Sequence, residues 1–178
     1  MPRLFTGIEI PAPVVQALAA LRGGLPGARW IDPENYHLTL RFIGDVDGTL
    51  ARDIMQILGE VRRSALELSF DRIDQFGGRK PRAVYAGAIP ALALTELQSE
   101  HERLMQRIGL EPEARKYAPH VTLARLRGSS AHEVAEYLSM RGPFRSPSFQ
   151  VSRFVLFSSK ASSGGGPYIV EAAYSLGR

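Results

Sequence analysis

A four-residue pattern occurs twice in this chain, as HLTL beginning at His37 and as HVTL beginning at His120. Each copy alternates polar and apolar residues, as a β-strand with one buried face does. His37 and Thr39 therefore share one face of a strand, and His120 and Thr122 share the corresponding face of another. The apolar residues between them point the other way, where helices can cover them. The repeat predicts two similar lobes that turn their histidines toward a common groove.

The segments around the two motifs follow one order, with a strand, a helix, a strand, a helix and a strand in each half. Alternating apolar residues predict strands, and apolar residues three or four apart predict helices. Asp47 can cap the second helix, and Ser130 with Glu133 forms a capping-box pattern before the fourth. The expected strands are 3–10, 36–43, 66–70, 82–89, 120–126, 149–157 and 168–176, and the expected helices are 14–21, 50–61, 94–108 and 130–138.

These elements favour the α+β class, with two pseudo-symmetric lobes of antiparallel-type sheet, outer helices and a central groove. A parallel doubly wound sheet is disfavoured, because no glycine-rich phosphate loop follows a strand. Gly164 to Gly166 lie between the last two expected strands, which is typical of a hairpin tip. We expect residues 1–178 to form one domain of two interleaved lobes, since this length can bury a sufficient core.

Composition narrows the classes of function. The 178 residues hold 22 Lys and Arg against 18 Asp and Glu, a net charge of +4, with no dense basic run. Phosphate recognition should therefore be local to a site. The absence of cysteine excludes disulfides, thiolate nucleophiles and cysteine-based metal sites. No stretch resembles a membrane span or a secretion signal, so we expect a cytoplasmic protein. No obligate protein partner is evident, and a monomer is expected.

Two histidines facing one groove suit the opening of a cyclic phosphodiester. One imidazole can take a proton from water while the other protonates the departing sugar oxygen, because histidine titrates near neutrality. Thr39 and Thr122 can donate hydrogen bonds to the non-bridging phosphate oxygens. A metal site is a weaker interpretation, since the motifs contain no His-x-His, no HExxH and no cysteine. We expect no metal and no cofactor.

The chain resembles the 2H phosphoesterase superfamily, and within it the RNA 2′,3′-cyclic phosphodiesterase branch, also associated with 2′–5′ RNA ligase activity. The resemblance is carried by RLFTGIEIP, RWIDPENYHLTLRFIGDV, KYAPHVTLAR, FVLFSSK and GPYIV, which together span most of the chain. It implies a bilobal fold, metal-independent hydrolysis and a product with a 2′-phosphate. It also implies that His120 is the general base and His37 the general acid.

Three further residues are candidates for substrate binding. Arg125 resembles the family's phosphate-contacting arginine, but strict alternation places it on the face opposite His120, so a bulge or the strand end would have to redirect it. Arg41 has the same parity as His37, which allows either a site residue or a solvated strand residue. Phe5 could present its ring to a base, or it could be ordinary core.

Three alternatives remain open at this point. The same chemistry could act on small cyclic nucleotides, ADP-ribose cyclic phosphate or 2′–5′ oligoadenylate. A non-catalytic protein could bind RNA ends in the same groove. The paired motif could also be a coincidence in a scaffold that needs no substrate. His101 lies on an apolar helix stripe and His132 follows Ser130, so we expect neither to take part in catalysis.

Overall fold

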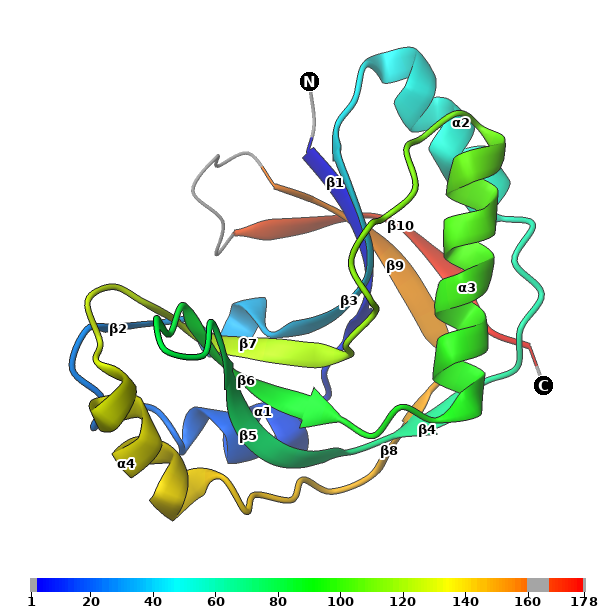
Figure 1. The fold of residues 1–178 in the computed structure, drawn as a ribbon. Coiled ribbons are helices and arrows are strands. Elements are labelled where there is room, and N and C mark those ends of the chain that lie inside the picture. Colours follow the sequence, from blue (N-terminus) through cyan, green and yellow to red (C-terminus); the bar gives the residue numbers. More distant parts are fainter. Residues whose placement is uncertain (1–2, 160–166, 178) are drawn as a thin grey trace.

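The computed structural model describes residues 3–159 and 167–177, so the expected hairpin tip at Gly164 to Gly166 lies outside the described residues. Two four-stranded sheets dominate the fold (Figure 1), with strand orders β10-β9-β1-β3 and β2-β7-β6-β5, and β4 pairs with β8 in a third sheet. The strands are β1 Arg3–Glu9, β2 Ala28–Trp30, β3 His37–Asp45, β4 Leu66–Leu68, β5 Phe70–Phe76, β6 Ala83–Ala88, β7 His120–Leu126, β8 Phe149–Val151, β9 Arg153–Ser159 and β10 Tyr168–Ser175.

All pairs between these strands are antiparallel, and the chain passes repeatedly between the two large sheets. Strand β2 lies between β1 and β3 in sequence but pairs with β7 in the other sheet. Strands β9 and β10 return at the end of the chain to complete the sheet of β1 and β3. The expected antiparallel α+β architecture is confirmed, and its two halves exchange strands.

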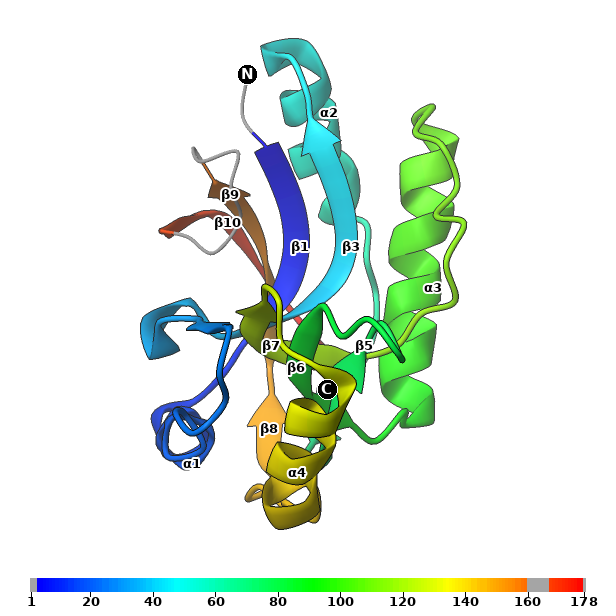
Figure 2. The same cartoon turned by 60° about the vertical axis from the view of Figure 1, so that its left-hand side comes forward.

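The helices lie outside the sheets, as Figures 1 and 2 show. Helix α3 contacts both α2 and β3, and α4 contacts β5. The Asp47 carboxylate accepts a hydrogen bond of 2.8 Å from the main-chain nitrogen of Leu50, and Ser130 with Glu133 forms the expected capping box. The helices are α1 Ala12–Ala19, α2 Gly48–Leu58, α3 Leu92–Arg107 and α4 Ala131–Arg141, with one 3₁₀ turn, η1 Pro33–Asn35.

Two expected strands are each divided in the structure. The strand expected at 66–70 becomes β4 and β5, and the strand expected at 149–157 becomes β8 and β9. Strands β4 and β8 pair with each other, whereas β5 belongs to one large sheet and β9 belongs to the other. The alternation of apolar and polar residues stays the same when a strand changes its pairing partner. The sequence therefore does not indicate where these strands divide. Strand β2 was not expected, because three residues are too few to establish alternation.

The apolar faces of the two motif strands are buried as expected. Leu38 and Leu40 on β3, and Val121 and Leu123 on β7, are at most 2% exposed and belong to the main hydrophobic core. Their neighbours His37, Thr39, His120 and Thr122 retain partial exposure on the opposite faces. No helix among the described residues is long and apolar enough to cross a membrane.

Candidate active site

The two motif strands, β3 and β7, contact each other across the sheets. Each begins at its motif histidine, and the two imidazoles are near enough that charge on His120 lowers the pKa of His37. Two residues far apart in the sequence thus lie in one electrostatic environment. The sequence predicted that the two motif strands face each other, and β3 and β7 are in contact in the fold.

Both imidazoles are held in the same way by the main chain. Nδ1 of His37 is 2.9 Å from the carbonyl oxygen of Asn35, and Nδ1 of His120 is 2.6 Å from that of Ala118. A carbonyl only accepts, so Nδ1 must carry the hydrogen in both rings. Each neutral ring therefore keeps Nε2 as the nitrogen that can accept or release a proton. The two carbonyls, each two residues before its histidine, fix the same tautomer on both strands.

Burial makes both imidazoles reluctant to ionise. It lowers the pKa of His37 to about 4, an effect that charges on His120 and Arg125 reinforce and that the Asn35 carbonyl opposes. Burial also lowers the pKa of His120, against the opposing effect of the Ala118 carbonyl. In the protein by itself both rings are therefore neutral at pH 7.

Aromatic rings provide the apolar surroundings of His37. The ring centroids of Phe5 and Tyr168 each lie 4.9 Å from that of His37, and the centroid of Phe157 lies 5.7 Å away. Phe5 is only 5% exposed and also packs on Phe157 at 5.0 Å. Phe5 therefore supports the imidazole and leaves little open surface for the base stacking considered from the sequence.

Two aromatic rings stand beside His120 in the other lobe. The centroids of Phe76 and Tyr85 lie 4.9 Å and 5.4 Å from that of His120, and both meet it edge-on. The sequence alone does not identify Phe76, Tyr85, Phe157 or Tyr168 as site residues. Tyr85 lies in an expected strand, and this was the one indication of its position in the sequence. Its contact with His120 depends on the register of β6 against β7, which places Tyr85 opposite Thr122.

A bulge in β7 brings Arg125 to the face of His120. Tyr85 pairs with Thr122 and Val84 pairs with Ala124, so Leu123 is an extra residue on β7. Leu123 and Ala124 are both fully buried, and Arg125 is then exposed. Its guanidinium is close enough to lower the pKa of His37. The bulge that strict alternation required is present.

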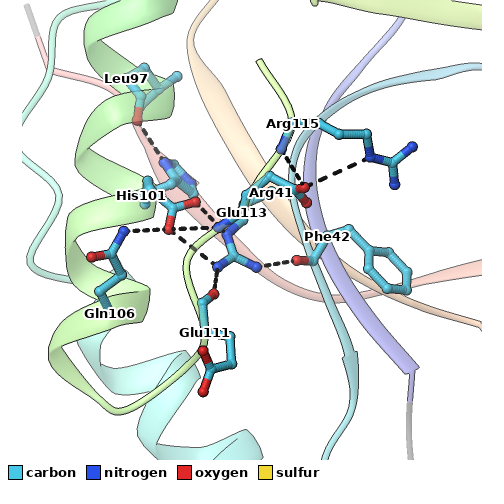
Figure 3. A network of polar contacts seen from close by, with 9 residues as sticks. Arg41, Phe42, Leu97, His101, Gln106, Glu111, Glu113 and Arg115 are labelled. Atoms are coloured by element: carbon cyan, nitrogen blue, oxygen red, sulfur yellow. Dashed lines mark hydrogen bonds and ion pairs between the residues drawn. The ribbon is translucent and has the colours of Figure 1, made fainter. Parts of the chain in front are cut away.

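The same irregularity in β3 removes Arg41 from the groove. Thr6 pairs with Arg41 and Gly7 pairs with Thr39, so Leu40 is the extra residue and Arg41 turns to the buried face. Arg41 is 6% exposed, and its guanidinium donates to Glu102 at 2.8 Å and to the carbonyl oxygens of Glu111 and Phe42, both at 2.6 Å (Figure 3). Arg41 is therefore neither a groove residue nor a solvated strand residue, and it ties β3 to α3.

The remaining histidines lie away from the groove. His101 is fully buried in α3, where its Nδ1 donates to the carbonyl oxygen of Leu97 at 2.9 Å and its ring packs edge-on against Phe154. His132 is exposed at the start of α4. Within residues 3–159 and 167–177, no group of three or more His, Cys, Asp or Glu side chains is arranged to hold a metal ion.

A pocket of about 490 Å³ opens beside His37, between η1, α1 and the ends of β9 and β10. Its wall combines aromatic rings with amide and carboxylate groups. The residues that matter for its chemistry are Glu9, Gln16, Glu34, Asn35, Phe157 and Tyr168. The pocket is large enough for a nucleoside and lies next to one of the two histidines.

Comparison with known proteins agrees with this arrangement. Residues 8–85 and 89–168 match the family described as LigT like Phosphoesterase. An RNA 2′,3′-cyclic phosphodiesterase of Aeropyrum pernix is 36% identical over 128 residues, covering 65% of this chain and 69% of the relative. One of Bacillus subtilis is 33% identical over 131 residues, covering 70% and 71%.

Among solved structures, the fold is similar to that of E. coli LigT complexed with 3′-AMP. The TM-score is 0.84 at 26% sequence identity, and the match covers 100% of both chains. The paired motifs, the antiparallel bilobal fold and the match over most of the sequence agree with one another. The chain belongs to the LigT-like phosphoesterase family.

Proposed function

We propose that this chain hydrolyses RNA 2′,3′-cyclic phosphate ends to 2′-phosphomonoesters, using His37 and His120 and no metal or cofactor. The observation that carries the proposal is the matched pair of imidazoles on β3 and β7. Each is fixed through Nδ1 by a carbonyl, which leaves Nε2 for proton transfer. The family membership and the activity named for the curated relatives support the same chemistry.

The two histidines take complementary roles in an in-line displacement. His120 accepts a proton from water as the water oxygen attacks phosphorus. His37 protonates the 3′-oxygen as its bond to phosphorus breaks, which leaves the phosphate on the 2′-oxygen. General acid–base catalysis of this kind contributes roughly 10²–10⁴-fold per group. In-line geometry requires the two rings to act from opposite sides of phosphorus.

The acid role of His37 depends on the charge of the substrate. Burial holds its pKa at about 4 in the protein by itself, so His37 is mostly neutral at pH 7. A cyclic phosphate diester carries one negative charge, and this charge next to the imidazole raises its pKa toward neutrality. Substrate binding thereby creates the protonated acid that the reaction uses.

Three side chains stabilise the phosphate in this proposal. Thr39 and Thr122 lie two residues after the histidines on the same faces, so their hydroxyls can donate to the non-bridging oxygens. Arg125 adds a positive charge that can grip two oxygens at once. The pocket beside His37 then takes the ribose and base of the terminal nucleotide, because the departing 3′-oxygen belongs to that nucleotide.

The proposed activity requires both lobes of the chain. Residues 1–178 act as a single domain, because the strand exchange between the sheets makes neither lobe complete without the other. The substrates are RNA ends or small cyclic nucleotides, and 2′–5′ ligation is the reverse reaction at the same site. The monomeric state and cytoplasmic location expected from the sequence stay predictions.

His37→Ala and His120→Ala, assayed beside the wild type with EDTA present, test this function. We expect each variant to lose at least about a hundredfold in kcat while still binding a 2′-nucleotide. The wild type should keep its activity in EDTA. Activity that disappears with EDTA, or variants that turn over normally, would contradict the two-histidine mechanism.

A further inference from the structure

Arg72 extends across the sheet toward His120. Arg72 on β5 pairs with Gly87 on β6, and Gly87 pairs with His120 on β7, so the three residues form one row. Directly paired residues project from the same face of a sheet. Arg72 and His120 therefore share the groove face, with a glycine between them, two strand spacings or about 10 Å apart at their Cα atoms.

The guanidinium of Arg72 fills the space above Gly87. A Cβ built on Gly87 would lie 2.5 Å from Cζ of Arg72 and 2.8 Å from each of its two terminal nitrogens. The charged group thus lies flat on the glycine, one strand spacing, about 5 Å, from the main chain of His120. A side chain at position 87 would exclude it from this place.

This guanidinium has polar contacts of its own and remains partly exposed. The Arg72 side chain is 43% exposed, and the ion pair it forms is with its neighbour Asp71 at 2.8 Å. It also approaches Tyr85, whose pKa is raised by burial while the charge and hydrogen bonding of Arg72 act in the opposite direction. Tyr85 in turn contacts the His120 ring. Arg72 is thus a partly exposed cation held beside the proposed general base.

The two sides of the groove differ in chemistry. Among the described residues, those lining the pocket beside His37 include no lysine or arginine, and they include Glu34 and the Glu9 carboxylate that pairs with Arg153. The side of His120 instead carries two arginines, Arg72 and, farther along β7, Arg125. The carboxylates of Asp71, which pairs with Arg72, and of Asp74, which lies opposite Tyr85, stand near Arg72. A nucleoside suits the first side, and a further phosphate suits the second.

We propose that Arg72 binds a phosphate of an RNA substrate that contains a 2′–5′ linkage. This phosphate is the next one after the reacting phosphorus, on the downstream RNA segment that begins with the 5′-oxygen of the linkage. This inference rests on the proposed function and its roles for the two histidines. Water attacks from the side of His120, and in a 2′–5′-linked RNA the 5′-oxygen occupies the place of that water. The next phosphate of the downstream RNA segment then lies on the side of Arg72.

The corresponding reaction is an internal transesterification. The 3′-hydroxyl gives its proton to His37 and forms a bond to phosphorus, while the bond from phosphorus to the 5′-oxygen breaks and His120 protonates that oxygen. The products are a 2′,3′-cyclic end and a 5′-hydroxyl strand, and no other reactant is needed. The cyclic end is then hydrolysed as proposed above.

The test compares two 2′–5′-linked dinucleotides that differ in one group, a 3′-phosphate or a 3′-hydroxyl on the downstream nucleotide. We expect Arg72→Ala to lower kcat/KM for the phosphorylated dinucleotide by roughly ten- to hundredfold more than for the other, the loss of one charged contact. Arg72→Lys should recover part of this difference. Arg52→Ala removes an exposed charge from α2 and should not change the ratio.

Gly87→Ala tests the same contact without removing a charge. Its Cβ would displace the guanidinium, and Gly87 has no left-handed backbone that would forbid alanine. It should therefore reduce the preference for the phosphorylated dinucleotide as Arg72→Ala does. An equal effect of Arg72→Ala on both dinucleotides overturns the proposal, and so does a wild type that cleaves neither.

A second pair of substrates, mononucleoside 2′,3′-cyclic phosphates with and without a 5′-phosphate, tests the side of the groove. If Arg72→Ala selectively impairs the 5′-phosphorylated compound, Arg72 contacts the upstream strand and the assignment is wrong. Wild-type turnover of these cyclic phosphates also separates the two proposals. Its absence contradicts the hydrolytic function itself. Turnover of the cyclic phosphates, together with an equal effect of Arg72→Ala on the two dinucleotides, contradicts only the assignment of Arg72.

Discussion

The hydroxyl of Tyr117 donates a hydrogen bond of 3.0 Å to the main-chain carbonyl of Thr39. Tyr117 lies three residues before His120, so this contact joins the approach to the second motif to the middle of the first. The guanidinium of Arg41 also binds the carbonyl oxygen of Glu111 in the same connecting segment. Two polar contacts thus hold the segment that enters β7 against β3, and they set how the two histidine strands meet.

Replacing Tyr117 with phenylalanine tests the first contact. Tyr117→Phe leaves the ring in place but removes the donor to Thr39, so we expect a loss of about 1 kcal/mol in the free energy of unfolding. Urea denaturation of the two proteins measures it. Because the segment leads into His120, kcat should fall while KM for a cyclic nucleotide changes little. A variant with unchanged stability and unchanged kcat would show that this contact does not position the motifs.

Arg41 should matter for stability more than any exposed arginine. Arg41→Ala removes the cation that pairs with Glu102, which among the described residues keeps only its contacts with Gln106 and the main chain of Glu113. We expect a loss of about 3 kcal/mol. Arg41→Leu combined with Glu102→Leu should lose less, because neither charge then remains unpaired. Thermal or urea unfolding of both variants distinguishes these outcomes. Equal losses in the two proteins would mean that the ion pair itself is not the cause.

The titration of His37 should respond strongly to a bound anion. Burial places its pKa at about 4 in the protein by itself, below the usual value near 6.5. Two-dimensional NMR of the imidazole should follow this titration, and a saturating 2′-nucleotide should move the pKa upward. Below pH 6.5 the unfolded chain protonates this histidine while the folded protein does not. Its contribution to stability is therefore lost as the pH falls from 6.5 toward 4. A His37 pKa near 6.5 that does not change when the nucleotide binds would contradict the acid role of this residue.

Arg125 should be required for catalysis even though strict alternation places it on the wrong face. The bulge at Leu123 and Ala124 turns it to the groove, so Arg125→Ala should lower kcat/KM by roughly ten- to hundredfold. Arg125→Lys should recover only part of this, since an ammonium cannot bind two phosphate oxygens in one plane. Steady-state kinetics on a cyclic nucleotide measures both. Normal kinetics in Arg125→Ala would place this residue outside the site.

The sequence could predict those features that depend on local pattern. The buried leucines and valine of the two motifs and the caps at Asp47 and Ser130 follow from alternation and capping rules, and the structure confirms them. The catalytic roles of the motif histidines stay a prediction. Arg41 shows where this reasoning ends. Its parity with His37 was correct for a regular strand, but one extra residue at Leu40 turns Arg41 to the opposite face.

Contacts that depend on strand register could not be predicted from the sequence. Phe76 and Tyr85 contact His120, and Arg72 lies in the same row, because β5, β6 and β7 pair in one register. No local pattern specifies that register. The row from Arg72 through Gly87 to His120 needs all three strands before it can be recognised. The aromatic rings beside His37 likewise come from β1, β9 and β10, which are distant from it in the chain.

The position of the phosphate in the product tests the central claim most directly. Wild-type protein and EDTA are incubated with a nucleoside 2′,3′-cyclic phosphate, and ³¹P NMR identifies the monoester that forms. Proton donation by His37 to the 3′-oxygen predicts a 2′-phosphate as the single product, and His37→Ala should abolish its formation. A 3′-phosphate, or an unreacted cyclic phosphate, would contradict the account.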